Sequence, residues 1–264
     1  MKVYTEKMHS FVLCAYGECE YLAECAASLA KQETKSRVLI ATSTPNEAIR
    51  RVAEGYGWPL HINTGESGIA GDWNFAISCA DTPLVTIAHQ DDVYEPEYVT
   101  EMLRAVNRVK DPILFFSAYA ELRRGQRVTS NRLLRIKKLL LTPVRVLPGA
   151  VFARRLSLAF GDPIGCPSVT YVKSVMERHP FRAGFRSNLD WQEWEELSRE
   201  KGRFVYCPGV LMAHRIHENS ETSRVIGETG RREEDLAMFR RFWPEKIARL
   251  LTAAYASSEK SNRV

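Results

Sequence analysis

Short apolar runs alternate along the chain with segments in which apolar residues recur every three or four positions. The runs are typical of buried strands, and the periodic segments are typical of helices that pack one face against a sheet. Strands are expected at residues 10–15, 37–41, 60–62, 84–89 and 113–119. Helices are expected at residues 18–31, 44–56, 72–80 and 96–110. This alternation predicts an α/β fold, with a mainly parallel central sheet flanked by helices on both faces.

Local signals mark where some of these elements begin. Thr44-Pro45-Asn46-Glu47 has the order of a capping box, with Thr44 as the N-cap of the helix that follows. Later in the chain, residues 188–197 have helical spacing, and residues 203–207 and 210–213 are expected as two short strands.

The last part of the chain is predicted to be helical. Residues 231–255 carry apolar side chains at helical spacing, and Pro244 should kink or break the helix. We therefore expect one domain over residues 1–225 and a C-terminal helical extension over residues 226–264.

A basic segment at residues 131–160 has a different character from its surroundings. Within it, residues 131–141 interleave Leu and Ile with basic residues such as Arg135, Lys137 and Lys138. Such a helix can lie on an anionic membrane as a peripheral contact, or it can pack on its own domain with its basic face in water. The pattern leaves both alternatives open.

Composition narrows the class of protein. With 264 residues and 45% hydrophobic content, the chain can bury a full core. Its net charge of +5 fits an anionic substrate or an anionic membrane surface, and we expect no nucleic-acid partner. The six cysteines form no CxxC pair, which argues against a zinc site and favours a reducing, cytoplasmic compartment. No apolar run is long enough to span a membrane.

The strongest chemical signal follows the strand at residues 84–89. Asp91 and Asp92 come directly after this buried run. Ligands of open α/β sheets bind at the carboxyl ends of strands, and carboxylates are the ligands that Mg²⁺ and Mn²⁺ prefer. The alternative is an ordinary solvated turn, in which Asp is common. No GxGxxG follows the first strand, so a dinucleotide-binding fold is disfavoured.

Four motifs in order resemble the family 2 glycosyltransferases with the GT-A fold. They span roughly residues 10–225. Tyr16 and Gly17 follow the first strand where the family usually has Tyr-Asn, and Asn74 stands where the family has its Asn before the metal strand. Gln90-Asp91-Asp92 resembles the DXD-type motif, and Asp190 resembles the acid of the Glu-Asp motif.

This resemblance implies a metal-dependent, inverting transfer of a sugar from a nucleotide-sugar donor. Asp92 and His217 are the implied ligands of Mn²⁺ or Mg²⁺, and Asp190 is the implied general base. Asp190 could instead cap a helix, and His217 could instead be structural. Trp191 and Trp194 could stack on a sugar, although at helical spacing they fit the core better. The implied donor-binding residues are Tyr16, Ser43, Asp72, Asn74 and Asp91.

One departure from the family concerns the nucleotide. The family usually carries an acid cluster after its second strand, where this chain has Ala41-Thr42-Ser43-Thr44. A UDP-sugar is therefore only the default donor. The basic amphipathic segment is the one basis for the expected acceptor, a saccharide or lipid-linked hydroxyl in cell-surface polysaccharide or glycolipid synthesis at the inner face of the plasma membrane. The alternatives are a nucleotidyltransferase and a catalytically inactive sugar-nucleotide binding module.

Overall fold

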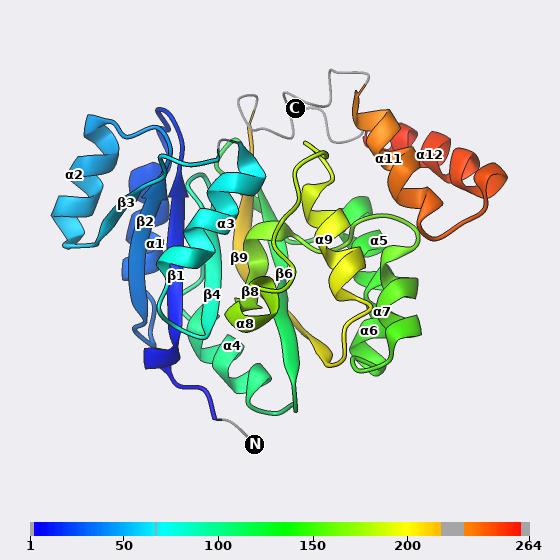
Figure 1. Cartoon of the computed structure of the whole chain (residues 1–264), viewed down its shortest axis with the longest axis horizontal. Coiled ribbons are helices and arrows are strands. Elements are labelled where there is room, and N and C mark those ends of the chain that lie inside the picture. Colours follow the sequence, from blue (N-terminus) through cyan, green and yellow to red (C-terminus); the bar gives the residue numbers. More distant parts are fainter. Residues whose placement is uncertain (1–2, 67, 218–229, 260–264) are drawn as a thin grey trace.

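The computed structural model describes residues 3–66, 68–217 and 230–259, with the side chains of 257–259 excepted. Its sheet has the strand order β3-β2-β1-β4-β8-β6-β9-β5, with β7 paired to β6 (Figure 1). The strands are β1 His9–Ala15, β2 Arg37–Thr42, β3 Leu60–Ile62, β4 Leu84–His89, β5 Val93–Tyr94, β6 Pro112–Arg123, β7 Gln126–Val128, β8 Val169–Val172 and β9 Arg203–Ile216. The predicted mixed α/β class with a mainly parallel sheet is confirmed.

The strand order creates one topological switch point. The chain runs from β1 outward to β2 and β3, and then crosses to the other side of β1 to form β4. The strands β1, β2, β3 and β4 are mutually parallel, so their carboxyl ends share one edge. The loops after β1 and β4 meet at this edge, which is where open α/β sheets bind ligands.

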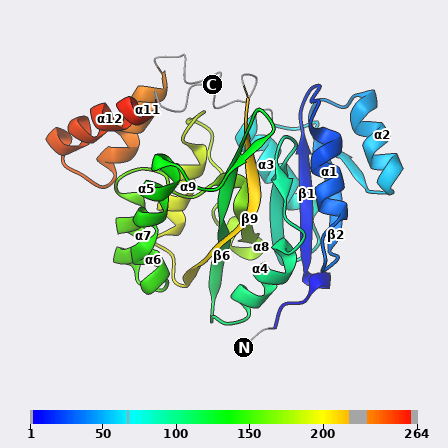
Figure 2. The same ribbon diagram turned by 180° about the vertical axis from the view of Figure 1, so that it is seen from behind.

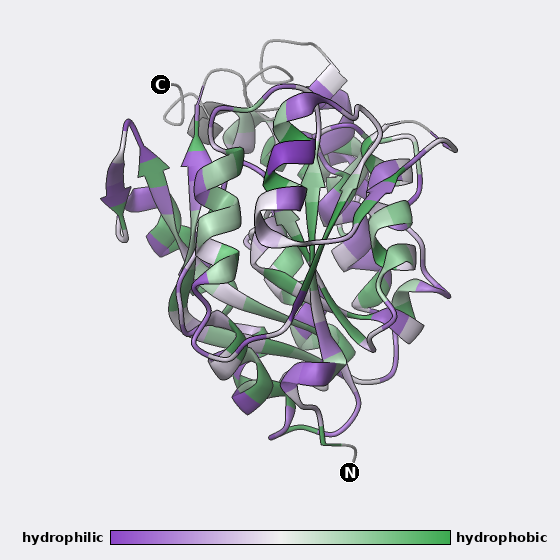
Figure 3. Cartoon of the chain, turned by 90° about the vertical axis from the view of Figure 1, so that its left-hand side faces the viewer, coloured by the Kyte–Doolittle hydropathy of each residue, from purple (hydrophilic) through white to green (hydrophobic). Residues whose placement is uncertain are grey.

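Helices cover both faces of the sheet (Figures 1 and 2). From the front, α3 lies over β1, β2 and β4, whereas α1 is seen in front of β1 from behind. The central strands are hydrophobic along their length (Figure 3), as expected for strands buried on both faces. The longer helices are α1 Leu22–Ala30, α2 Glu47–Tyr56, α3 Ile69–Cys79, α4 Tyr98–Val106, α5 Arg132–Leu140, α7 Val151–Leu158, α9 Leu189–Leu197, α11 Gly230–Arg240 and α12 Glu245–Glu259. The short ones are α6 Thr142–Val146 and α8 Lys173–Met176.

Two local predictions are wrong in detail. The N-cap of α2 is Asn46, whose side chain accepts a hydrogen bond from the Ile49 amide at 3.0 Å. Thr44 accepts from the Gly17 amide at 2.6 Å instead, and so joins the loops after β1 and β2. The expected strands 203–207 and 210–213 are one strand, β9, because its pairing with β6 skips over residues 208–209 and then resumes.

The C-terminal helices pack onto the rest of the fold. Pro244 separates α11 from α12, as predicted. Phe239 meets the buried Trp191 ring at a centroid distance of 5.1 Å, and the Trp243 indole donates to the Ala159 carbonyl at 2.7 Å. Because Met238, Phe239 and Ala248 belong to the same buried cluster as the sheet, the extension shares the core of the domain.

Candidate active site

The loops after β1 and β4 are tied together at the switch point. The Gln90 side-chain amide accepts from the Tyr16 amide at 3.0 Å and donates to the Tyr16 carbonyl at 2.8 Å. The Tyr16 side chain remains 61% exposed. This arrangement fixes the backbone of both loops and leaves an aromatic ring available to a ligand.

Ser43, in the loop after β2, and Asp72, in α3, contact each other near this edge of the sheet. The Ser43 hydroxyl donates to Asp72 Oδ2 at 2.9 Å, and the Asn63 amide donates to Asp72 Oδ1 at 2.8 Å. Asp72 lies in the first turn of α3. An acid from α3 therefore reaches the loop after β2, where the sequence has hydroxyls instead of an acid.

Asn74 takes a different position from these two donor-binding candidates. Its side-chain amide donates to the Phe181 carbonyl, and its oxygen accepts from the Phe181 amide, both at 2.9 Å. The pair of bonds joins α3 to the segment before α9. A direct contact between Asn74 and a donor stays a prediction.

Asp92 is completely buried and is held from β9. Its Oδ1 accepts from the Arg215 amide at 2.8 Å and lies 3.0 Å from His214 Nδ1. Burial lowers the pKa of His214, but the Asp92 carboxylate outweighs burial and raises this pKa to about 9. The second carboxylate oxygen, Oδ2, is buried and has no hydrogen-bond partner in the described part of the chain.

This oxygen, which accepts no hydrogen bond from the described residues, fits a divalent cation. His89, Asp91 and Asp92 each offer a ligand atom, and these atoms lie within 4.8 Å of one another. His89 Nε2 is also buried without a hydrogen-bond partner among the described residues, and its ring stacks on Trp73 at 5.3 Å. An imidazole with two carboxylates suits Mn²⁺ better than Mg²⁺, which takes oxygen ligands. The residues present therefore fit the predicted metal.

His217 lies next to this cluster, within reach of its acids. Its Nε2 is 2.9 Å from Asp91 Oδ2. Burial raises the pKa of Asp91, but the His217 hydrogen bond and the nearby His89 and His214 rings lower it below its ordinary value overall. The structure thus brings both sequence-predicted metal ligands to one site. It also adds His89, which we had not assigned although it stands two residues before Asp91.

Arg215 secures the acidic loop and was not predicted from the sequence. Its Nε donates to the Asp91 carbonyl at 2.8 Å, and its guanidinium lies 4.1 Å from the centre of the Tyr21 ring. Its Nη2 donates to Glu24 of α1 at 2.5 Å. These contacts hold Asp91 and Asp92 between α1 and β9, so the carboxylates are positioned before any ligand binds.

Asp190, the candidate base, lies in the first turn of α9. The N-cap of this helix is Asn188, and Asp190 is not the N-cap residue. Asp190 Oδ1 accepts from the Trp191 amide at 2.8 Å, and burial raises the pKa of the Asp190 carboxyl. Trp191 and Trp194 are fully buried and belong to the core, as their spacing indicated.

Asp190 and the metal cluster are connected by a row of contacts. The Lys137 ammonium lies 5.5 Å from the centre of the Tyr119 ring, and that ring meets His214 edge-on at 6.2 Å. Lys137 interacts electrostatically with Asp190, and His214 is hydrogen-bonded to Asp92. The base candidate and the metal candidate are therefore linked through Lys137, Tyr119 and His214.

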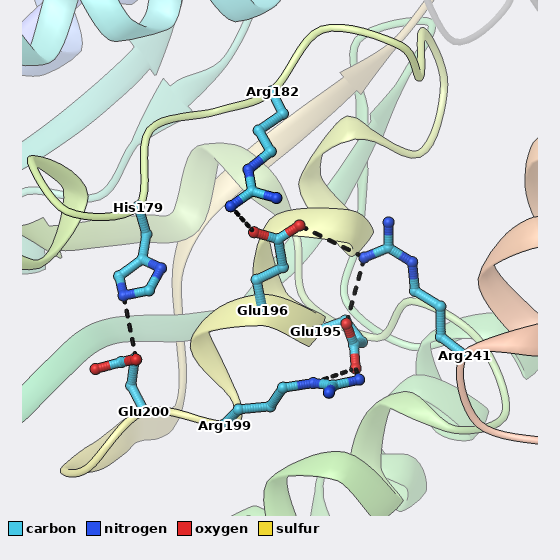
Figure 4. Close-up of a pocket in the computed structure, with 7 residues that line it drawn as sticks. All are labelled: His179, Arg182, Glu195, Glu196, Arg199, Glu200 and Arg241. Carbon is cyan, nitrogen blue, oxygen red and sulfur yellow. Dashed lines mark hydrogen bonds and ion pairs between the residues drawn. The ribbon is translucent and has the colours of Figure 1, made fainter.

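A separate hollow of about 420 Å³ lies beside α9 (Figure 4). It contains none of the predicted site residues. Its acids and bases are paired with one another, as in Arg182 with Glu196 at 3.4 Å and His179 with Glu200 at 3.1 Å. This mutual neutralisation favours neither an anionic nor a cationic ligand. The lining residues are His179, Arg182, Glu195, Glu196, Arg199, Glu200 and Arg241.

Comparison with solved structures shows the same fold in known glycosyltransferases. TarS 1–349 of S. aureus in complex with UDP-GlcNAc has a TM-score of 0.63 at 14% identity, covering 96% of this chain and 72% of that one. The mannosyltransferase PcManGT from Pyrobaculum calidifontis in complex with GDP-Man and Mn²⁺ has a TM-score of 0.65 at 16% identity, covering 98% and 71%. Glucosyl-3-phosphoglycerate synthase from Mycobacterium tuberculosis, with Mn²⁺, UDP and glucosyl-3-phosphoglycerate, has a TM-score of 0.52 at 13% identity, covering 80% and 73%.

These likenesses confirm the predicted GT-A fold. No curated protein matches the sequence significantly. The family model described as Glycosyl transferase family 2 matches residues 10–166, which is more than half of the chain. The chain therefore belongs to glycosyl transferase family 2.

Proposed function

We propose that the protein is a metal-dependent, inverting glycosyltransferase that uses a nucleotide-sugar donor. The observation that supports this most is the buried Asp92 Oδ2, which accepts no hydrogen bond from the described residues and lies beside Asp91 and His89 at the carboxyl end of β4. Mn²⁺ or Mg²⁺ would be held by these three residues together with His217. Bound there, the cation supplies positive charge to the diphosphate that leaves the donor.

The nucleotide would bind across the loops after β1 and β2. Tyr16 offers a ring for stacking on the base, and the Ser43–Asp72 pair offers a hydroxyl and a carboxylate for its edge. In this proposal Asp72 replaces the acid that family members carry after the second strand. Asn74 would act by holding α3 against Phe181. UDP-sugars are the first donors to test, and GDP-sugars the second, since PcManGT was solved with GDP-Man.

The acceptor hydroxyl would lose its proton to Asp190. Burial raises the pKa of this carboxyl, which makes it a better proton acceptor than an exposed Asp. A single displacement, in which the hydroxyl oxygen attacks the anomeric carbon opposite the departing diphosphate, inverts the configuration at that carbon. Such a reaction needs one base and one site for the leaving group, and Asp190 and the acidic cluster would supply them.

Asp190→Asn tests the role of the base. Because Asn cannot accept the proton, the transfer rate should fall by roughly 10²- to 10⁴-fold while donor affinity and melting temperature stay close to wild type. The transfer rate is measured from the nucleoside diphosphate that is released. NMR of the product shows the configuration at its anomeric carbon. Glu193→Gln is the matched control, because Glu193 is the next acid on α9 and is 2% exposed. Asp190→Asn activity within about threefold of wild type would move the role elsewhere.

The acceptor would be a saccharide or lipid-linked hydroxyl presented at a membrane surface. On α5, α6 and α7 the apolar side chains of Leu139, Val146 and Phe152 are 71%, 67% and 65% exposed. The basic side chains of Arg135 and Lys138 lie exposed on α5. Apolar and basic groups together match the interior and the head groups of an anionic bilayer. No helix within the described ranges has the length and apolar character needed to cross a bilayer.

A further inference from the structure

A second acid, Asp162, lies against the proposed base. It stands in the turn after α7, where its Oδ1 accepts from the Ile164 amide at 3.0 Å. The carboxyl groups of Asp162 and Asp190 are hydrogen-bonded to each other, although 28 residues separate them in sequence. Nothing in the sequence had marked Asp162 as part of the site.

A hydrogen bond between two carboxyl groups requires that one of them carries a proton, because two carboxylates offer only acceptors. The surroundings decide which one is protonated. Asp190 faces two cations, Lys137 and Arg231, and accepts from the Trp191 amide. Asp162 faces Lys137 and accepts from the Ile164 amide, but Arg231 is recorded against Asp190. Negative charge is therefore stabilised better on Asp190, and the proton belongs on Asp162.

We propose that Asp162 is a positioning residue, which stays protonated and donates a hydrogen bond that keeps Asp190 ionised and aimed at the acceptor. This inference rests on the proposed role of Asp190 as the base. Burial and the Asp190 charge raise the pKa of Asp162 well above its ordinary value, in agreement with a neutral carboxyl.

The other groups around the pair leave this assignment intact. Cys166 and Tyr171 also face Asp190, but burial raises the pKa of both groups, so they carry no charge at neutral pH. Lys137 is held by Tyr119 on its far side. The cations Lys137 and Arg231, which face the pair, come from α5 and α11.

The transfer step keeps the Asp162 proton in place. The acceptor hydroxyl gives its proton to Asp190 as its oxygen bonds to the anomeric carbon. The bond from that carbon to the diphosphate oxygen breaks, and the diphosphate leaves with the electron pair. Asp162 donates its hydrogen bond to Asp190 throughout and keeps its own proton. The Asp190 carboxylate is the group that becomes protonated in the reaction.

Substitutions at Asp162 separate hydrogen-bond donation from proton acceptance. Asp162→Asn keeps a donor, because an amide N–H can replace the carboxyl O–H. Its pH–rate profile should match wild type. Asp162→Ala removes the donor, so the pKa of Asp190 should rise and the acidic limb of the profile should move up by about one pH unit. Melting temperatures of both variants show whether they fold.

Carbon NMR of the aspartate carboxyls gives a readout that needs no activity. With signals assigned from Asp190→Asn and Asp162→Asn, the wild-type titration should show Asp162 protonated and Asp190 ionised at pH 7. Because this titration is made on the wild-type protein, it does not depend on whether the Asp162→Ala variant folds. An ionised Asp162 at pH 7, or an Asp190 titration unchanged in a folded Asp162→Ala, would overturn the inference.

The two assignments can fail separately. If Asp190→Asn remains active while the titration is as expected, the base assignment is wrong and the hydrogen bond stands. If Asp162→Asn loses as much activity as Asp190→Asn, Asp162 takes the proton itself and the positioning role is wrong.

Discussion

At the scale of single residues, the pair Asp91–Asp92 could be found from sequence because its signal is local. A continuous apolar run ending in two acids places carboxylates at the end of a buried strand, and the structure confirms that placement. His89 and Asp162 could not be assigned in this way. His89 stacks on Trp73, which is distant in sequence, and Asp162 meets Asp190 only once α7 and α9 have packed.

Glu193 gives a prediction about stability and pH. Burial and the neighbouring Glu196 carboxylate raise the pKa of Glu193 to about 8, and one of its oxygens has no hydrogen-bond partner among the described residues. The native state therefore keeps a proton that the unfolded chain releases above about pH 4.5. The free energy of unfolding should consequently fall as pH rises from about 4.5 to 8.

Glu193→Gln should remove that loss. The variant should be more stable than wild type at pH 8 by roughly 1–3 kcal/mol, and nearly equal to it at pH 4.5, by urea unfolding. Glu177→Gln, at an exposed position, is the control and should change neither value. A wild-type stability that does not depend on Glu193 across this range would contradict the account.

At the scale of elements, periodicity located most helices, but it did not show how each one is oriented. The α5 segment illustrates the limit. Its pattern grouped Lys137 with Arg135 and Lys138 on one basic face, but Lys137 turns inward to Tyr119 and the two acids, while the other two remain exposed. Which basic residue of α5 enters the site depends on how the helix packs against β6. The sequence pattern of α5 alone does not predict this packing.

The proposed membrane contact of α5 can be tested with the two exposed basic residues. Arg135→Glu combined with Lys138→Glu should abolish sedimentation with anionic vesicles at moderate salt, because each cation near such a surface contributes roughly 1 kcal/mol. The double variant Arg50→Glu and Arg51→Glu carries the same charge change on α2, at the opposite end of the molecule (Figure 1). Equal loss in both pairs would indicate a general charge effect instead of a docking face.

At the scale of the whole molecule, the alternation of strands and helices was sufficient to predict the parallel half of the sheet. It was not sufficient for the other half. The strand β8 is antiparallel to both of its neighbours and lies between β4 and β6, which are adjacent along the chain apart from the two-residue β5. Its four residues carry too short a pattern to indicate this insertion.

The C-terminal helices should unfold together with the sheet, since Phe239 is fully buried against Trp191. Phe239→Ala should lower the free energy of unfolding by about 3–5 kcal/mol in a single transition. Leu250→Ala, on the neighbouring helix α12 and 70% exposed, should change it by less than about 0.5 kcal/mol. Two transitions in urea, with only one of them shifted by Phe239→Ala, would show that the extension is an independent domain.

The central claim is that Asp92 and its neighbours hold a divalent cation that binds the diphosphate of the donor. It is tested most directly by thermal shift with a panel of nucleoside diphosphates, with Mn²⁺ or with EDTA, in wild type and Asp92→Asn. Binding to the native state raises the melting temperature. The account predicts that at least one nucleotide stabilises wild type in Mn²⁺, and that EDTA or Asp92→Asn removes this shift without unfolding the protein. A nucleotide shift of equal size in EDTA, or in Asp92→Asn, would contradict it.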